Sequence, residues 1–173
     1  MLARATIGMA LALAAVPALA ADSWPILLKV DGAKWKLRLE LPGFSAMDHQ
    51  QEGKRQIHTY LDRDRSMLLS VMIEQVPGKA TMEGCREINR RRAAGGGTFR
   101  PVDTLAGTRD EAETMELSIP LSADGKVVQR HIFTCRVRGD RYIDSHVSKV
   151  RYTPEDRNAL YAVLDGVAIV DPA

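Results

Sequence analysis

The feature that most constrains the fold is a pair of long runs, residues 127–138 and 141–152, that contain no glycine or proline and are rich in β-branched and aromatic residues. Such runs are typical of β-strands, in which successive side chains point to opposite faces. A Gly-Asp pair separates the two runs and supplies a two-residue turn. The sequence therefore predicts an antiparallel hairpin in which Cys135 lies opposite Asp144.

Further strands are expected along the chain, because other apolar or alternating runs are bounded by turn residues. The clearest is KWKLRLEL at 34–41, in which the tryptophan and the leucines fall on one face. Residues 44–54 are polar and irregular, and we expect a loop there. The remaining strand candidates are residues 24–30, 55–61, 66–76, 98–105, 112–121 and 167–170.

Two helices are expected from their capping residues. Thr81 is a good N-cap for a helix over 81–94, and Glu83 is an acid in its first turn. Thr-Pro-Glu-Asp at 153–156 combines a cap, a proline at the first helical position and two acids. Because several strands precede any helix, we predict an α+β fold with an antiparallel sheet of about six to eight strands, flanked by helices at about 81–94 and 154–165.

Three arginines followed by three glycines, within CREINRRRAAGGGTFRP at 85–101, form the strongest local signal. Cations suit the last turn of a helix, and glycine commonly ends one. A phosphate-binding loop places its glycines before a helix, where free N–H groups face the anion. We therefore favour a helix end followed by an exposed loop, with an anion-binding loop as the alternative.

The first twenty residues have the pattern of an export signal. Arg4 precedes an apolar run at 7–20 that ends in Ala-Leu-Ala, and small residues there suit a signal peptidase. The run is short for a membrane span, which needs about 20 residues, and a retained anchor is the alternative. We predict a signal peptide at 1–20 and a single α+β domain at 21–173, located in the periplasm or, alternatively, secreted.

Cys85 and Cys135 are the two cysteines of the chain. In an oxidising compartment, two cysteines in one domain usually pair, and the alternative is two separate buried thiols. Pairing would close a loop of about fifty residues, for which the chain-entropy estimate is roughly 4 kcal/mol. We predict a disulfide bond between them.

One face of the predicted hairpin is rich in basic residues and is expected to be solvent-exposed, at least near the turn. Such a face is commonly just solvated, and it also discourages edge pairing. The alternative is a docking surface for an acidic protein, lipid head group or wall polymer. This predicted basic face carries Arg130, Arg136, Arg138, Arg141 and Lys149.

The opposite face brings His131, Asp144 and His146 near one another, because cross-strand neighbours lie about 5 Å apart and diagonal ones about 7–8 Å. Two imidazoles and a carboxylate suit zinc or copper. A hydrogen-bonded His–Asp pair inside a sheet is the commoner arrangement. We therefore predict no metal and no other cofactor, and keep these three residues as the candidate ligands should one bind.

No catalytic residues are predicted. GFSAM at 43–47 lacks the second glycine of a nucleophile elbow, and the sequence has no HExxH pair. Lys and Arg number 24 and Asp and Glu number 22, so the charge balance gives no reason to expect nucleic acid or an anionic membrane as a partner. After the leader, no segment is apolar enough to span a bilayer.

The order of strand pairs, helix, further antiparallel strands and late helix, together with LELPGFS at 39–45, resembles the Mog1/PsbP/DcrB-like group of small α/β proteins. That group has an antiparallel sheet flanked by helices. It includes photosystem accessory proteins, secretion-effector chaperones, a small-GTPase partner and periplasmic proteins. The resemblance implies a binding or accessory module.

We therefore predict an exported, non-catalytic protein that binds another envelope or secreted protein, as an envelope accessory or immunity-type module. The alternative is a carrier of a small ligand or metal on the face of His131, Asp144 and His146. An enzyme of an unrecognised type is the third possibility.

Overall fold

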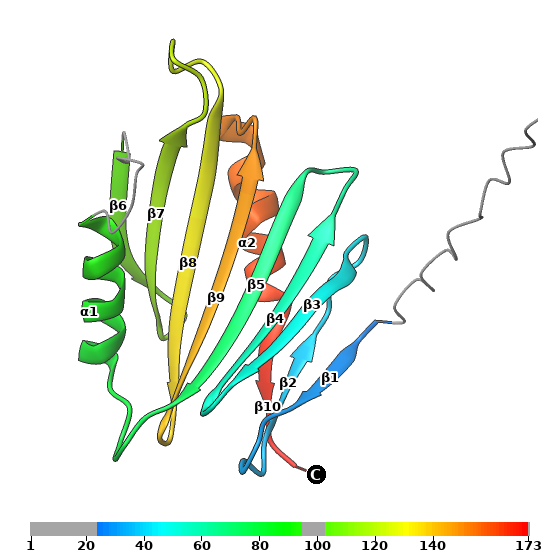
Figure 1. Cartoon of the computed structure of the whole chain (residues 1–173), viewed down its shortest axis with the longest axis vertical. Coiled ribbons are helices and arrows are strands. Elements are labelled where there is room, and N and C mark those ends of the chain that lie inside the picture. Colours follow the sequence, from blue (N-terminus) through cyan, green and yellow to red (C-terminus); the bar gives the residue numbers. More distant parts are fainter. Residues whose placement is uncertain (1–23, 95–102, 173) are drawn as a thin grey trace, which may run out of the picture.

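The computed structural model describes residues 24–94 and 103–172, so the predicted signal peptide and the glycine-rich segment lie outside the described residues. Within the described part, ten strands and two α-helices follow one another as Figure 1 shows. Their bounds are β1 (Ile26–Lys29), β2 (Lys36–Leu39), β3 (Ser45–Glu52), β4 (Arg55–Asp62), β5 (Met67–Gln75), α1 (Met82–Ala93), β6 (Asp103–Arg109), β7 (Ala112–Pro120), β8 (Val128–Arg138), β9 (Arg141–Val150), a 3-10 turn (Pro154–Asp156), α2 (Arg157–Asp165) and β10 (Val167–Val170).

The strands form two antiparallel sheets. The larger sheet has seven strands in the order β3-β4-β5-β9-β8-β7-β6, and the smaller has three in the order β1-β2-β10. The predicted α+β class with an antiparallel sheet and two flanking helices is therefore confirmed. The β8–β9 register is also as predicted, since Cys135 pairs with Asp144 and the two strands meet at Gly139 and Asp140.

The expected loop at 44–54 is wrong, because β3 occupies most of it. All eight residues of β3 are exposed, and its register against β4 shifts between Ala46 and Asp48. An edge strand that is wet on both faces needs no apolar alternation, and the sequence gives no other strand signal there. The strand expected at 98–105 is described only from Asp103, where β6 begins.

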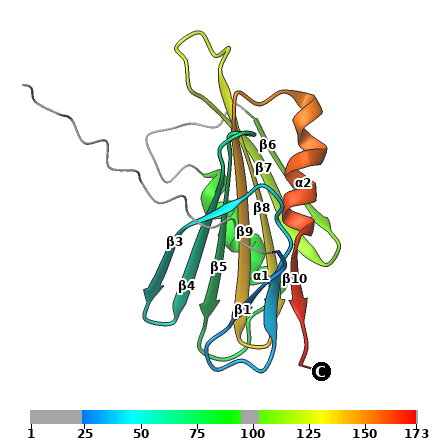
Figure 2. The same ribbon diagram turned by 90° about the vertical axis from the view of Figure 1, so that its right-hand side faces the viewer.

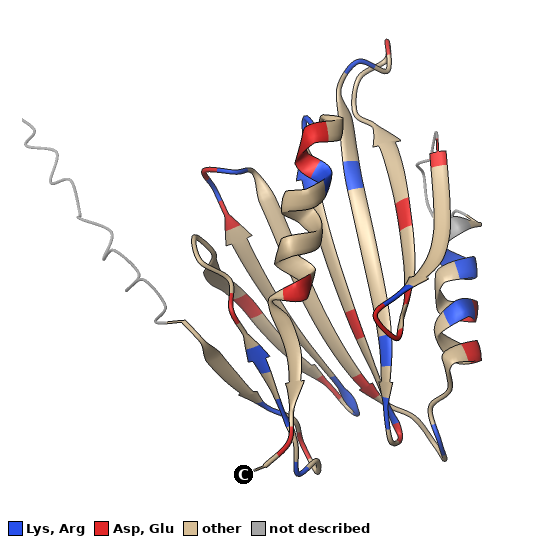
Figure 3. Ribbon diagram, turned by 180° about the vertical axis from the view of Figure 1, so that it is seen from behind, with Lys and Arg blue, Asp and Glu red and all other residues tan. Residues whose placement is uncertain are grey.

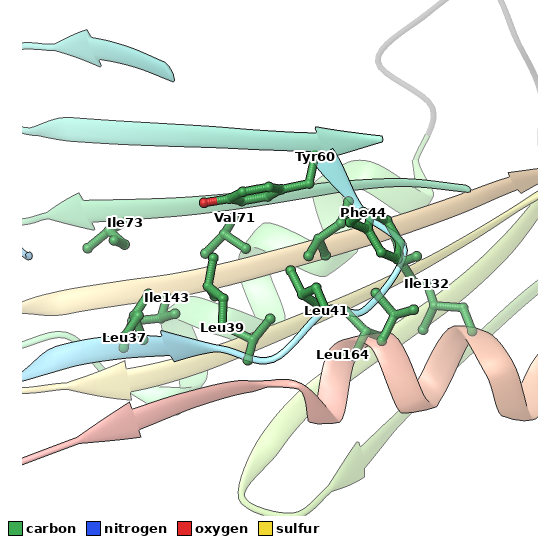
Figure 4. Close-up of a cluster of buried hydrophobic side chains, with 14 of the residues drawn as sticks. Leu37, Leu39, Leu41, Phe44, Tyr60, Val71, Ile73, Ile132, Ile143 and Leu164 are labelled. Carbon is green, nitrogen blue, oxygen red and sulfur yellow. The ribbon is translucent and has the colours of Figure 1, made fainter. Parts of the chain in front are cut away.

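One face of the large sheet, the core face, carries the hydrophobic core. The small sheet and α2 cover this face, as Figure 2 shows. In Figure 4, Leu37, Leu39 and Leu41 follow one another through the core, with Leu37 beside Ile143 of the large sheet and Leu41 beside Leu164 of α2. The four leucine side chains are at most 1% exposed, so burying each contributes about 1.5–3 kcal/mol.

The opposite, outer face of the large sheet carries α1. Thr81 caps this helix by accepting a hydrogen bond from the Gly84 backbone N–H at 3.1 Å. The predicted disulfide between Cys85 and Cys135 is confirmed, with a Cα–Cα distance of 5.5 Å, and it ties α1 to β8. In Figure 1, α1 lies over the β6–β8 side of the sheet, while α2 lies behind it.

The arginines at the end of α1 have partners within the protein. Arg90 and Arg91 pair with Glu87 one turn earlier. Arg92 reaches Asp144 on β9. The helix-end interpretation of this stretch therefore fits the structure. In the described ranges, neither helix has the length and apolar character needed to cross a membrane.

Candidate functional site

The candidate site lies on the outer face of the large sheet, on strands β4, β5, β9 and β8. Because cross-strand partners share a face, the register places Leu61, Leu68, Ser148 and His131 in one row across β4, β5, β9 and β8. Ser70 and His146 lie in the next row. We call this surface the open face, defined by Leu61, Leu68, Ser70, His131, His146, Ser148 and Val150.

A hollow of about 430 Å³ lies at one end of the open face. Its walls are mostly apolar, and Val150 is 37% exposed there. A hollow of this size is within the usual range for ligand pockets, roughly 300–1,000 Å³. Its lining comprises Leu61, Arg63, Ser66, Met67, Leu68, Gln129, Ser148 and Val150.

His131 and His146 form a hydrogen-bonded pair beside this hollow. Nδ1 of His131 lies 2.9 Å from Nε2 of His146, and the two rings stack with centroids 5.1 Å apart. Phe133 extends the stack at 4.2 Å from His146. Burial lowers the pKa of His131 to about 4. Burial, then the neighbouring His131 and Arg92, lowers the pKa of His146 to about 3. Both imidazoles are therefore neutral at pH 7.

Asp144, the third candidate metal ligand, is held by Arg92 of α1. The Arg92 guanidinium donates to both carboxylate oxygens of Asp144 and lies over the Phe133 ring at 4.5 Å. Burial raises the pKa of the Asp144 carboxyl, and the Arg92 charge opposes that shift by favouring the ionised form. The structure thus brings the two histidines together but ties the carboxylate to an arginine. The described residues contain no cluster of three or more His, Cys, Asp or Glu side chains suited to a metal ion.

The predicted basic face lies on the core face of the sheet, and the expectation that it is solvent-exposed is wrong at two positions. Arg130 and Arg141 are each only 7% exposed. Arg141 donates to the Asp31 carbonyl at 2.6 Å and pairs with Asp140, at the turn end that was expected to be wettest. The physical reason is that α2 and the small sheet pack against this face of the hairpin.

The other three basic residues are also bonded within the chain. Arg136 donates to the Val167 carbonyl at 3.0 Å, Arg138 pairs with Asp171, and Lys149 donates to the Arg65 carbonyl at 2.8 Å. Figure 3 shows Lys and Arg interspersed with Asp and Glu over this side of the molecule. A docking role for the five residues stays a prediction. These internal bonds already use much of the hydrogen-bonding capacity of their side chains.

Glu116 on β7 is a structural centre that the sequence reasoning missed. It is 1% exposed and accepts hydrogen bonds from Arg130, Arg157 and Tyr161. Burial alone would raise its pKa, but the bonds from Arg157, Arg130 and Tyr161 outweigh burial and hold the pKa at about 2. Burial is the larger cause that raises the pKa of Tyr161 to about 12, and the hydrogen bond from Tyr161 to Glu116 adds to this rise. This cluster fastens α2 to the large sheet.

Two solved structures share this fold at low sequence identity. The solution structure of cyanobacterial PsbP (CyanoP) from Synechocystis sp. PCC 6803 is 12% identical with a TM-score of 0.50, over 79% of this chain and 86% of that chain. The crystal structure of LpqN, involved in cell envelope biogenesis of Mycobacterium tuberculosis, is 11% identical with a TM-score of 0.50, over 84% of this chain and 89% of that chain. No family model and no curated protein matches the chain. The predicted resemblance to the Mog1/PsbP/DcrB-like group is confirmed at the level of the fold.

Proposed function

We propose that this chain, which has the fold of PsbP and LpqN, is an exported, non-catalytic accessory protein that binds another envelope protein through its open face. The leader-like pattern at 1–20 and the Cys85–Cys135 bond support export, because disulfides persist mainly in oxidising compartments. LpqN, with the same fold, is a protein involved in cell envelope biogenesis. An envelope accessory module and an immunity-type module are the two versions of this proposal.

The observation that carries the proposal is the character of the open face. Leu61 and Leu68 are partly exposed on the neighbouring strands β4 and β5, and they line the hollow together with the exposed Val150. Among the described elements, α1 is the helix on this face, and its main contacts are with β7 and β8. A surface that leaves apolar side chains beside a shallow hollow is typical of a protein-binding site.

The chemistry of the histidine pair fits binding better than catalysis. A general base works best with a pKa near the operating pH. The pKa values of His131 and His146 lie near 4 and 3, and the two rings bond to each other. A neutral aromatic stack beside leucines suits an apolar or uncharged segment of a partner.

Capture from an envelope extract tests this proposal. Immobilised protein with the Leu68→Glu substitution should lose a partner that the wild type retains, because a carboxylate would have to be buried in the interface. Leu27→Glu is the matched control, since Leu27 is 54% exposed on β1, away from the open face. If Leu68→Glu and Leu27→Glu retain the partner equally, the open face is not the binding surface.

A small apolar ligand is the second candidate, favoured by the hollow of about 430 Å³. Native mass spectrometry of the purified protein would then show a stoichiometric adduct that Leu68→Glu loses. A bare protein mass, with a partner still captured from the extract, would leave protein binding as the function.

A further inference from the structure

The outer edge of strand β6 has backbone hydrogen-bonding groups that no described strand pairs with. β6 ends the seven-stranded sheet and pairs with β7 on its inner side, and no described strand pairs with its outer side. Six of its seven residues are exposed, and Leu105 is 56% exposed. The register against β7 runs without a shift, whereas β3 at the opposite edge carries a shift. An edge without proline, lysine or a bulge is a template for another strand.

We propose that two copies of the chain pair through β6 in antiparallel orientation, about a two-fold axis at Ala106. The strand reads DTLAGTR, which is complementary to itself when one copy is reversed. Asp103 then lies opposite Arg109, Thr104 opposite Thr108, and Leu105 opposite Gly107. Opposite charges and threonine pairs across strands are stabilising, while like charges are destabilising. An in-register parallel pair would instead set Asp103 beside Asp103 and Arg109 beside Arg109.

Gly107 is the second observation behind this pairing. Its φ is not positive, and a Cβ there would contact only the Thr114 hydroxyl oxygen at 3.5 Å, so the fold itself does not require glycine. Glycine inside a strand weakens the strand and often marks a close approach by another group. A hollow of about 440 Å³ lies between β6 and α2 and is lined by Gly107, Arg109 and Tyr161.

In the paired arrangement, the partner subunit's Leu105 lies across from Gly107 on the same side as this hollow. An exposed leucine therefore gains contact with Gly107 and with the rim of this hollow in the other copy. The interface is isologous, because Leu105 of each copy meets Gly107 of the other.

The two charged ends of β6 remain available for this contact. Asp103 accepts from Arg130 at 2.7 Å, yet its side chain is 59% exposed. Arg109 pairs with Asp165 at 2.6 Å, with its side chain 39% exposed. A carboxylate accepts several hydrogen bonds and a guanidinium donates up to five, so each group retains capacity for the partner subunit.

A register-specific cross-link tests the arrangement directly. In the proposed pair the two copies of residue 106 lie opposite each other, about 4.5–5.5 Å apart between Cα atoms, which suits a disulfide. Ala106→Cys should therefore give a covalent dimer under mild oxidation, read on a non-reducing gel of the otherwise native, oxidised protein. Thr104→Cys is the matched control, because two copies of residue 104 would lie about 14 Å apart.

A second variant tests the contact without cysteine chemistry. Leu105→Lys places a cation diagonal to two cations of the partner subunit, its Arg109 and the lysine introduced at its position 105. These like charges repel, so sedimentation should show a shift from dimer to monomer. Leu27→Lys, at a leucine of similar exposure on β1, should leave the dimer intact. The concentration series should extend to about 200 μM, because an interface of less than about 1,200 Å² gives weak association.

Strong cross-linking of Ala106→Cys with little for Thr104→Cys, together with loss of the dimer in Leu105→Lys, supports the proposal. Equal cross-linking of the two cysteine variants would mean random collision and would overturn it. A monomer throughout the concentration series would overturn it as well.

Discussion

Replacing Glu116 by Gln should remove a charge that holds α2 on the large sheet. The substitution keeps the shape of the side chain and one acceptor oxygen, so it isolates the effect of the charge. Arg130, whose side chain is 9% exposed, would then remain as a buried cation without its closest counter-charge. Losing one partner of a buried ion pair typically costs about 3–5 kcal/mol.

The same magnitude follows from the titration of Glu116. Its pKa is about 2 in the folded protein, against about 4.3 in an unfolded chain. A depressed carboxyl pKa contributes stability above the unfolded value, and this stability is lost as the pH falls toward the folded value. At about 1.36 kcal/mol per unit, the charge contributes about 3 kcal/mol at pH 7 and about 1.5 kcal/mol at pH 3.

Urea unfolding of the oxidised protein, followed by circular dichroism at pH 7 and pH 3, measures this contribution. Glu116→Gln should lower the free energy of unfolding by about 3 kcal/mol at pH 7 and by about half as much at pH 3. Glu52→Gln, at an exposed residue of β3, is the control and should change stability by less than about 0.5 kcal/mol. A Glu116→Gln cost below about 1 kcal/mol, or one that does not change with pH, would refute the reasoning.

Three further changes have defined outcomes. Since burial lowers the pKa of His131 to about 4 and of His146 to about 3, unfolding takes up protons below pH 6.5, and each histidine reduces stability by about 1.4 kcal/mol per pH unit as the pH falls. The double variant His131→Gln, His146→Gln should therefore lose less unfolding free energy per pH unit between pH 6.5 and 4.5. His58, whose pKa burial also lowers to about 4, should supply the remaining dependence on pH. An unchanged dependence of stability on pH would contradict the pKa values of His131 and His146. The double variant Cys85→Ser, Cys135→Ser should lose about 4 kcal/mol of unfolding free energy in urea, because the disulfide closes a loop of about fifty residues. An unaltered urea midpoint would show that the disulfide does not restrict the unfolded chain. Gly84→Ala should lower the melting temperature although alanine favours helices, because its Cβ would lie 1.8 Å from the Tyr142 hydroxyl oxygen. Adding Tyr142→Phe should recover part of the loss. A raised melting temperature would mean that α1 does not pack so closely on β9.

The parts of the fold that could be predicted from the sequence are those set by neighbouring residues. The Gly139-Asp140 turn fixes the β8–β9 register, so the opposition of Cys135 and Asp144 follows from local spacing. Thr81 and the residues at 153–156 mark helix starts through bonds to nearby backbone groups, such as the one from the Thr153 N–H to Asp156. These features need no knowledge of distant segments.

The features that could not be predicted depend on residues far apart in the chain. Alternation along β8 defines two faces but does not tell which one packs against α2 and the small sheet. Arg130 therefore looked like a surface residue, whereas Glu116 and Asp103 neutralise it in the interior. Likewise, Asp144 looked available to a metal until α1 brought Arg92 onto it.

Site-specific photo-cross-linking inside the native envelope tests the open face most directly. A benzophenone side chain at position 68 should give an adduct with one discrete partner, while the same side chain at position 27 should give none. An adduct at position 27 but not at position 68 would place the binding surface elsewhere. Absence of any adduct at position 68, from protein that is exported and oxidised, would contradict the proposed function.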